Sequence, residues 1–353
     1  MLSIDKGLWI LHKHLGELLS IDSTDTDSLA SYLHETGACV GSRSDILERI
    51  ENIRAYRTSL KELQAQPQVA QRTPEWYELR KNRLTASDAA QAMEKGKFGS
   101  RAQLVTKKAF PELHTVNMSS PPLKWGTMFE PMATRCYSQR NNDMIIHEFG
   151  LIPHPTIPCF GASPDGITEL GIMVEYKCPF KRQITGEVLE QYEIQMQGQM
   201  AVCGLKECDF VECDMERLSD KDAYVASMAA NANTDHGIIL EYNTDTDKYL
   251  YSPAYLTTAE CLDWMGQQPT GYVTVYFWRL RKISIQRVMF DEKRWLGMVP
   301  TLLDFWKDVE LARTQAPPAL KVQANEVVGK GWGGAGGTTV YDFIPDDDDT
   351  SVP

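Results

Sequence analysis

The chain has 353 residues, enough for one large domain and a smaller appendage, and its 42% hydrophobic and 24% charged content is ordinary for a soluble globular protein. No apolar run approaches the roughly 18 residues of a membrane-spanning helix, and the N-terminus lacks the layout of a signal peptide, so we expect no membrane contact. The net charge of −12 argues against a broad nucleic-acid-binding surface, because phosphate binding usually leaves a basic footprint.

Cysteine usage indicates a reducing environment. The eight cysteines include no Cys-x-x-Cys pair, and the five-residue spacing of Cys203, Cys208 and Cys213 suits no common zinc site. We expect buried, reduced thiols rather than an iron–sulfur cluster, in an intracellular compartment.

Residues 1–70 have a helical pattern. Leucines recur at helical spacing from Leu8 to Leu19, Asp27–Ala30 marks a second helix start, and Ser42–Leu63 carries the apolar stripe of a third helix. These residues are therefore expected to form a small helical appendage without visible chemistry. The polar segment Gln64–Pro74 is its expected linker.

Two short helices are predicted after the linker. Glu75–Lys81 is the first, and the run from Thr85 to Asp88 is typical of the start of the second. Thr85 stands at the expected cap and Asp88 follows three residues on, so plain capping is the simplest role for both side chains.

Further helices are predicted over Ala102–Phe110 and Trp125–Gln139. The apolar stripe of the longer helix includes Phe129 and Met132, and Glu130 lies beside this stripe. A glutamate in this position is usually a solvated surface residue.

The segment from Asp165 to Lys177 concentrates charge in a small stretch of chain. Asp165 lies in a Pro-Asp-Gly turn, and the residues after it form a predicted strand on which Glu175 and Lys177 point to one face. If Cys159–Ala162 is the partner strand, the turn brings Asp165 beside Glu175. Carboxylates arranged in this way bind hard cations such as Mg²⁺, and a lysine beside them can orient an attacking water. An ordinary turn and a solvated Glu-x-Lys pair are the alternative interpretation.

A central sheet is predicted around this segment. Its candidate strands are Met144–Ile152, Cys159–Ala162, Ile172–Cys178 and Asp209–Cys213, and a helix over Leu189–Cys203 joins the last two. On this helix Tyr192 and Gln195 share a face. Gln195 would position water or a phosphate there, unless it is simply an amide in a polar crevice.

The pattern weakens after residue 215. A hairpin over His236–Tyr242 and Tyr249–Ser252, an apolar and basic strand over Tyr272–Ile285 and an amphipathic helix over Arg294–Ala312 are expected. Within the strand, Trp278–Arg281 is better explained by packing with charged edges than by DNA contact. Residues 316–353 are rich in glycine and acid and are expected to form a disordered tail.

Asp165, nine intervening residues and Glu175-x-Lys177 match the signature of the PD-(D/E)XK nuclease superfamily. The flanking motifs resemble one branch of it, the lambda-phage exonuclease or YqaJ-type viral recombinase family. These motifs are Trp76–Arg80 with Leu84–Asp88, Trp125–Ala133 and Tyr192–Gln197, in the family's order between residue 72 and about 213. The segment Val174–Arg182 is more similar to versions from large eukaryotic DNA viruses than to the phage enzyme.

The resemblance implies roles for individual residues. Arg80 and Ser87 would hold a 5′-terminal phosphate, which agrees with the donors that a guanidinium, a hydroxyl and a helix N-terminus offer. Glu130 would be a third carboxylate near the metal. The expected catalytic residues are thus Asp165, Glu175, Lys177, Gln195 and Glu130; the expected metal ligands are Asp165, Glu175, Glu130 and the Tyr176 carbonyl; and the expected DNA-binding residues are Arg80, Ser87, Tyr192, Gln197, Lys181 and Arg182.

These observations predict an α/β protein with a restriction-endonuclease-like core, a central mixed β-sheet flanked by helices, over residues 71–315. The expected activity is that of a Mg²⁺-dependent deoxyribonuclease, with Mn²⁺ as a substitute, which degrades 5′-phosphorylated duplex DNA ends processively from 5′ to 3′ in viral recombination, repair or genome processing. Endonuclease or RNase activity on the same fold and a non-catalytic recombination scaffold remain alternatives. A single-strand annealing or single-stranded-DNA-binding protein and further copies of the chain are the expected partners, in the nucleus or cytoplasm of an infected host.

Overall fold

The computed structural model describes residues 2–16, 18–97, 99–113, 120–231, 233–244 and 248–317. The predicted tail therefore lies outside the described residues from position 318 onward. Within the described part of the chain, no helix has the length and apolar character needed to cross a membrane.

The N-terminal segment forms the three helices that its pattern predicts, α1 (Ile4–Leu15), α2 (Thr26–Glu35) and α3 (Arg43–Gln64). Helix α3 begins with a capping box, in which Ser42 and Asp45 each bond the other's backbone N–H at 3.2 and 2.9 Å. Leu8 and Leu11 of the predicted leucine stripe are buried, whereas Leu18 lies beyond the end of α1 and is 79% exposed.

These helices share an apolar core with the neighbouring sheet, because Met144, Leu170 and Ile172 belong to the same buried cluster as the α1–α3 side chains. A group of ion pairs strengthens the contact. Arg49 of α3 and Arg287 both pair with Glu207, and Arg287 also binds Asp209 with an Nε–Oδ1 distance of 2.5 Å. The appendage is thus held to the core by packing and by buried charges. Its boundary at residue 70 stays a prediction.

A seven-stranded mixed sheet forms the centre of the molecule, in the order β2-β5-β6-β7-β10-β8-β9. A small second sheet has the order β1-β4-β3. The strands are β1 (Leu84–Thr85), β2 (Ile146–His147), β3 (Ile152–Pro153), β4 (Phe160–Ala162), β5 (Gly166–Thr168), β6 (Met173–Lys177), β7 (Glu207–Leu218), β8 (His236–Tyr242), β9 (Tyr249–Tyr251) and β10 (Tyr272–Met289).

Strands β6 and β7 are parallel and are joined by helix α8 (Glu190–Cys203), so the predicted strand–helix–strand crossover is confirmed. Two strand predictions were wrong in detail. Met144–Ile152 is not one strand, because β2 and β3 lie in different sheets. Strand β4 does not pair with β6; its partners are β1 and β3, and β5 is the strand that pairs with β6. The expected pairing failed because β5 has only three residues and follows the Pro-Asp-Gly turn without a gap.

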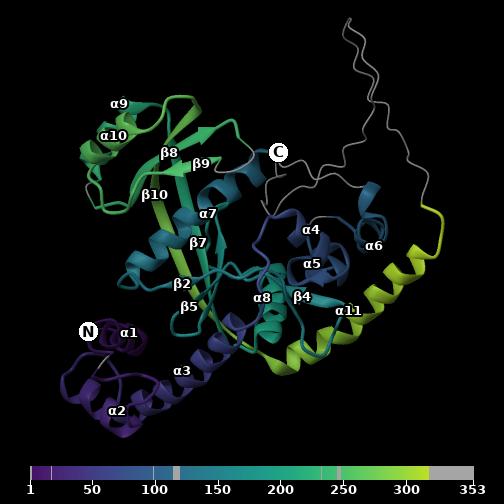
Figure 1. Ribbon diagram of the computed structural model, residues 1–353, viewed down its shortest axis with the longest axis horizontal. Coiled ribbons are helices and arrows are strands. Elements are labelled where there is room, and N and C mark those ends of the chain that lie inside the picture. Colours follow the sequence, from purple (N-terminus) through teal and green to yellow (C-terminus); the bar gives the residue numbers. More distant parts are fainter. Residues whose placement is uncertain are drawn as a thin grey trace, which may run out of the picture.

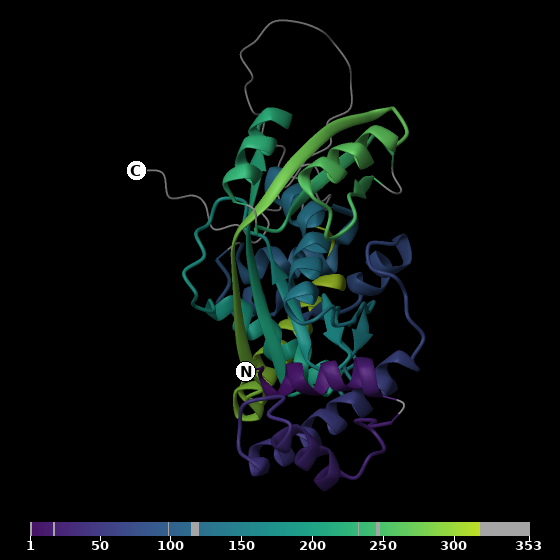
Figure 2. The same ribbon diagram turned by 90° about the vertical axis from the view of Figure 1, so that its left-hand side faces the viewer.

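Helices surround the sheet, as Figure 1 shows. The N-terminal helices lie at one end of the long strands β7 and β10, and α9 (Lys221–Ala230) and α10 (Thr258–Gln267) lie at the other (Figures 1 and 2). To the side are α4 (Pro74–Lys81), α5 (Ala86–Ala92), α6 (Arg101–Ala109) with the 3-10 turn Pro111–Leu113, and α11 (Glu292–Arg313). Helix α7 (Pro121–Arg140) packs on β6 and β7. The mixed sheet with flanking helices is the architecture predicted from the sequence.

Candidate active site

Strands β5 and β6 bring the first two carboxylates together. Asp165 immediately precedes β5, and antiparallel pairing sets Gly166 opposite Val174. Asp165 Oδ2 accepts a hydrogen bond of 2.9 Å from the backbone N–H of Tyr176. Asp165 therefore lies beside Glu175, as the sequence predicted. The strand that pairs with β6 is β5, however, and not the 159–162 segment.

Glu175 is 1% exposed and both of its oxygens are engaged. Lys177 Nζ lies 3.1 Å from Oε1, and Gln195 Nε2 donates to the same oxygen at 2.7 Å. Gln199, one turn further along α8, donates to Oε2 at 2.8 Å. A buried carboxylate is tolerated only with such partners, so α8 and Lys177 together hold the Glu175 side chain in place.

Glu130 of α7 completes a group of three carboxylates. Its Oε2 lies 2.5 Å from Nη2 of Arg72, in the segment before α4. Burial raises the pKa of Glu130, the Arg72 guanidinium counteracts this, and the charge of Glu175 raises it further. Burial, then Glu175, then Glu130 raise the pKa of Asp165 well above its usual value. The three side chains are thus close enough to repel one another.

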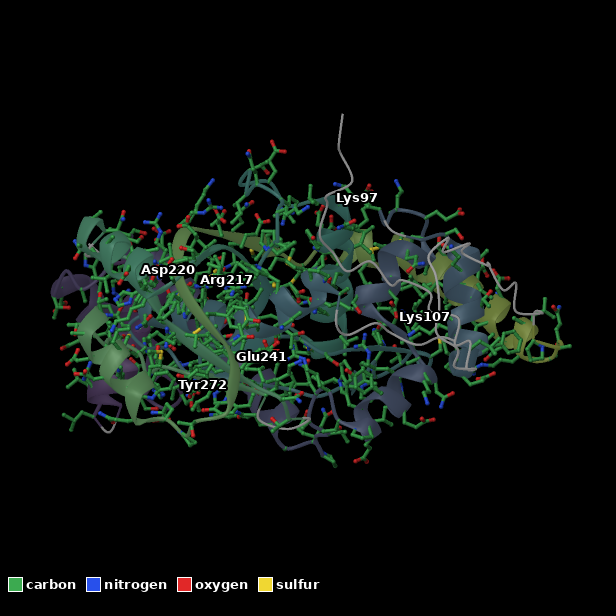
Figure 3. All side chains as sticks on the ribbon, turned by 90° about the horizontal axis from the view of Figure 1, so that it is seen from above. Lys97, Lys107, Arg217, Asp220, Glu241 and Tyr272 are labelled. Atoms are coloured by element: carbon green, nitrogen blue, oxygen red, sulfur yellow. The ribbon has the colours of Figure 1, made fainter. Side chains whose placement is uncertain are left out.

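The group lies in a pocket of about 530 Å³. Most of the predicted site residues contribute to its lining: Arg80, Ser87, Glu130, Asp165, Glu175, Tyr176, Lys177, Arg182, Tyr192 and Gln195. Lys107 of α6 also lines the pocket. Figure 3 shows this residue away from Arg217 and Glu241. The strand pair, α7 and α8 therefore converge on one cavity.

The carboxylates are the type of ligand that binds a divalent cation, but their oxygens do not converge on one point. Within the described residues, no three acidic, histidine or cysteine side chains form a ready metal-binding group. The reason is visible in the contacts, because Arg72 holds Glu130 while Lys177 and two glutamines hold Glu175. Burial and the repulsion from Glu175 and Glu130 raise the pKa of Asp165, and a bound cation would offset both effects by favouring the charged carboxylate.

A second group of donors lies on another wall of the pocket. Arg80 stacks on Trp76, 4.3 Å from the ring centroid, and its Nη2 approaches Ser87 Oγ at 3.3 Å. Lys108 pairs with Asp88 at 2.8 Å, and despite the opposing effect of burial this lysine holds the pKa of Asp88 below its usual value. Arg80, Ser87 and the buried Lys108 thus form a cationic corner suited to a phosphate.

The capping role expected of Thr85 and Asp88 is wrong. Thr85 occupies the N-cap position of α5 but makes no side-chain cap bond. Its Oγ1 donates instead to Asp88 at 2.8 Å. The two side chains therefore belong to the hydrogen-bonded surroundings of the cationic corner, because Asp88 also binds Lys108.

Two predicted DNA-binding residues are not brought to the pocket. The amide of Gln197 donates to the Met289 carbonyl at 2.9 Å and accepts from the Asp291 N–H at 2.8 Å, which ties α8 to the end of β10. Lys181 is exposed and is absent from the pocket lining among the described residues. The Tyr-x-x-Gln-x-Gln and Lys-Arg patterns did not show whether the side chains of Gln197 and Lys181 face the pocket.

Two residues of the site were missed from the sequence. Gln199 follows Gln195 by four positions, a helical spacing that would have placed both amides on one face. Arg72 lies in the segment interpreted as linker, where no periodic pattern points to the pocket.

Two solved structures to which this chain is similar are those of an alkaline exonuclease and of a protein–RNA complex. The alkaline exonuclease LHK-Exo from Laribacter hongkongensis, in complex with dAMP, shares 26% identity over 69% of this chain and 95% of its own, with a TM-score of 0.45. A KSHV SOX RNA complex covers 88% of both chains at 11% identity and a TM-score of 0.34.

An uncharacterised protein of Acanthamoeba polyphaga mimivirus is 23% identical over 340 residues, which cover 81% of this chain and 60% of the mimivirus protein. The chain thus spans about 60% of the length of this curated relative. Residues 75–206 match the model of the YqaJ-like viral recombinase domain. This range contains every site residue predicted from the sequence, and it confirms the resemblance that the motifs indicated. Residues 75–206 of this chain are therefore similar to the YqaJ-like viral recombinase domain.

Proposed function

We propose that this protein is a divalent-metal-dependent deoxyribonuclease that degrades duplex DNA from 5′-phosphorylated ends in the 5′-to-3′ direction. The observation that carries the proposal is the convergence of Asp165, Glu175, Glu130 and Lys177 in one pocket with the cationic corner around Arg80. Carboxylates serve a metal that activates water, and the corner serves a terminal phosphate.

The residues divide the work of phosphodiester hydrolysis between them. Asp165, Glu175, Glu130 and the Tyr176 carbonyl would hold Mg²⁺ or Mn²⁺, which polarises the phosphate and lowers the pKa of water. Lys177, beside Glu175 at 3.1 Å, orients the attacking water and offsets the charge that grows on the phosphate. Gln195 and Gln199 keep the Glu175 carboxylate in one orientation, because each donates to a different oxygen.

The cationic corner supports the proposed polarity. Arg80 and Ser87 lie in the same pocket as the carboxylates, so a 5′-terminal phosphate bound there would set the scissile bond at a fixed distance along the strand. After each cleavage the new terminal phosphate would occupy the same seat. A repeated seat of this kind supports processive digestion of one strand.

Digestion of end-labelled DNA tests the proposal. With Mg²⁺ or Mn²⁺ the protein should release nucleotides from a 5′-labelled linear duplex and should leave a circular duplex and RNA intact; EDTA should stop the reaction. Asp165→Asn should lower the rate by at least about 10²-fold. It should not lower the melting temperature, because the raised pKa of Asp165 means that its charge opposes folding at neutral pH.

The matched control is Asp214→Asn, which removes a carboxylate from a partly exposed ion pair with Arg281 and does not line the pocket. This variant should digest DNA at the wild-type rate, since exposed ion pairs contribute little. Near wild-type digestion by the Asp165 variant would refute the assignment of the site, and release from the 3′ label would refute the polarity.

A further inference from the structure

Arg72 occupies a backbone conformation that its side chain does not favour. Its φ is 66°, in the left-handed region that suits glycine, and it directly precedes the cap of α4. Gln71 fixes this backbone, because its amide donates to the carbonyls of Phe149 at 2.8 Å and Pro164 at 3.1 Å. Pro164 adjoins Asp165, so the segment is tied to the turn that carries the first carboxylate. Strain of this kind is typical of functional positions.

The Arg72 side chain lines the pocket and pairs with Glu130, one of the three carboxylates. Its guanidinium binds Glu130 at 2.5 Å, and the charge of Asp165 also acts on it. The Arg72 side chain is 41% exposed, whereas Glu175 is held by three partners that are themselves inside the protein. The Arg72–Glu130 pair is therefore more open to solvent than the buried group around Glu175.

A cation on Glu130 and the guanidinium on Glu130 compete for the same oxygens. If the carboxylate turns to a metal, Arg72 loses its partner and is repelled by the new positive charge. The phosphate of a bound strand would then compensate the guanidinium, which binds phosphate oxygens through two parallel hydrogen bonds. The anchored backbone keeps the arginine at the pocket during this exchange.

We propose that Arg72 is a further catalytic residue, which neutralises Glu130 in the resting site and moves to a non-bridging oxygen of the scissile phosphate when substrate is bound. The proposal rests on the nuclease function proposed above. It adds a phosphate-binding group from outside the matched domain, since residues 75–206 do not include Arg72. In the alternative, Arg72 only orients Glu130 and never contacts the substrate.

A double-mutant cycle separates these roles. Arg72→Ala should lower the single-turnover rate at saturating Mg²⁺ by about 10²-fold, and Arg72→Lys should recover only part of the loss because it lacks the two-pronged geometry. In a Glu130→Gln background the Arg72→Ala change should still cause a clear further loss. If Arg72 acts only through Glu130, the second change has no further effect.

Binding supplies a readout that is independent of turnover. The affinity of the free protein for Mn²⁺ should stay equal or rise in Arg72→Ala, because Glu130 is released from its ion pair. Weaker Mn²⁺ binding, together with a rate restored by excess metal, would establish the orienting role and overturn the proposal. The control is Arg43→Ala, whose side chain is 44% exposed and pairs with Asp27 at 2.6 Å, and it should change neither quantity.

The wild-type protein distinguishes failure of the two proposals. If it digests no DNA under any of the conditions above, the nuclease function fails and the role of Arg72 fails with it. If it digests DNA and Arg72→Ala does so equally fast, only the role of Arg72 is wrong.

Discussion

Glu175 shows how the pocket keeps a buried negative charge. The side chain is 1% exposed, and an unpaired carboxylate at such a depth would be strongly destabilising. Lys177 and two amides of α8 satisfy its oxygens without a metal. This arrangement holds the Glu175 side chain in place, whereas burial, followed by the charges of Glu175 and Glu130, raises the pKa of Asp165 well above its usual value.

The role of Arg80 can be tested with the chemistry of the DNA end. Arg80→Ala should remove the preference for a 5′-phosphate over a 5′-hydroxyl, because it deletes the charged donor stacked on Trp76. A charge-assisted hydrogen bond contributes about 1.5–3 kcal/mol, so kcat/KM on phosphorylated ends should fall about 10- to 100-fold. Arg217→Ala is the control, because Arg217 does not line the pocket and lies well away from Lys107 in Figure 3. Equal losses on both kinds of end would contradict the phosphate seat.

The signature residues could be predicted from the sequence, whereas the residues that hold them in place could be predicted only in part. Asp165, Glu175 and Lys177 could be placed together because a turn and the two-residue period of a strand fix their directions. Arg72 could not, since its position depends on a left-handed backbone that Gln71 fastens to two distant carbonyls. Gln197 shows the opposite error, because its motif suggested DNA while its amide ties α8 to β10.

At the scale of elements, the loop between β5 and β6 joins the N-terminal helices to the site. Gly171 in this loop has a φ of 75°, and a Cβ there would lie 2.5 Å from the backbone carbon of Tyr56 in α3. Glu169 of the same loop binds His147 of β2 at 2.6 Å and Arg57 of α3 at 3.1 Å, and His12 of α1 lies 3.6 Å away. Helices α1 and α3 are therefore fastened to the turn that follows Asp165.

This contact should make stability depend on acid. The neighbouring His12 side chain, followed by His147 and Arg57, lowers the pKa of Glu169 from 4.5 to about 2 although burial opposes the shift. A depressed pKa contributes stability that is complete above the unfolded value and is lost as the pH falls from about 4.5 to about 2. Glu169→Gln should remove this part of the pH dependence of the urea midpoint. Glu62→Gln, at an exposed site on α3, should leave the pH dependence of the urea midpoint unchanged. If the wild type and Glu169→Gln show the same pH dependence, Glu169 does not contribute to acid stability.

Long elements were predicted well and short ones were not. The helices α3, α8 and α11 have clear apolar stripes or caps, and they lie within a few residues of their predicted ranges. Strands β2, β3 and β5 have two or three residues each, too few for a periodic pattern, so their pairing depends on tertiary contacts.

For the whole molecule, the net charge of −12 and a nucleic-acid substrate are compatible because the positive charge is concentrated. Seven basic and four acidic side chains line the pocket, a local excess of three positive charges. The basic ones are Arg72, Arg80, Lys81, Lys107, Lys108, Lys177 and Arg182. An acidic exterior around such a cavity would limit binding to strands that enter it. The sequence could show the basic residues but not their convergence, which depends on how α4, α6 and β6 are placed around the pocket.

The salt dependence of DNA binding measures how many of the basic residues of the pocket contact phosphates. With about three phosphates neutralised, the logarithm of affinity should fall against the logarithm of salt with a slope of about −2.7, so a rise from about 50 to about 200 mM should weaken binding about 40-fold. Anisotropy of a labelled duplex in EDTA gives the slope without digestion. Lys107→Ala should reduce its magnitude by about 1, because this residue lines the pocket, and Lys221→Ala on α9 should not. A slope unaffected by Lys107 but reduced by Lys221 would place the DNA on the other end of the molecule.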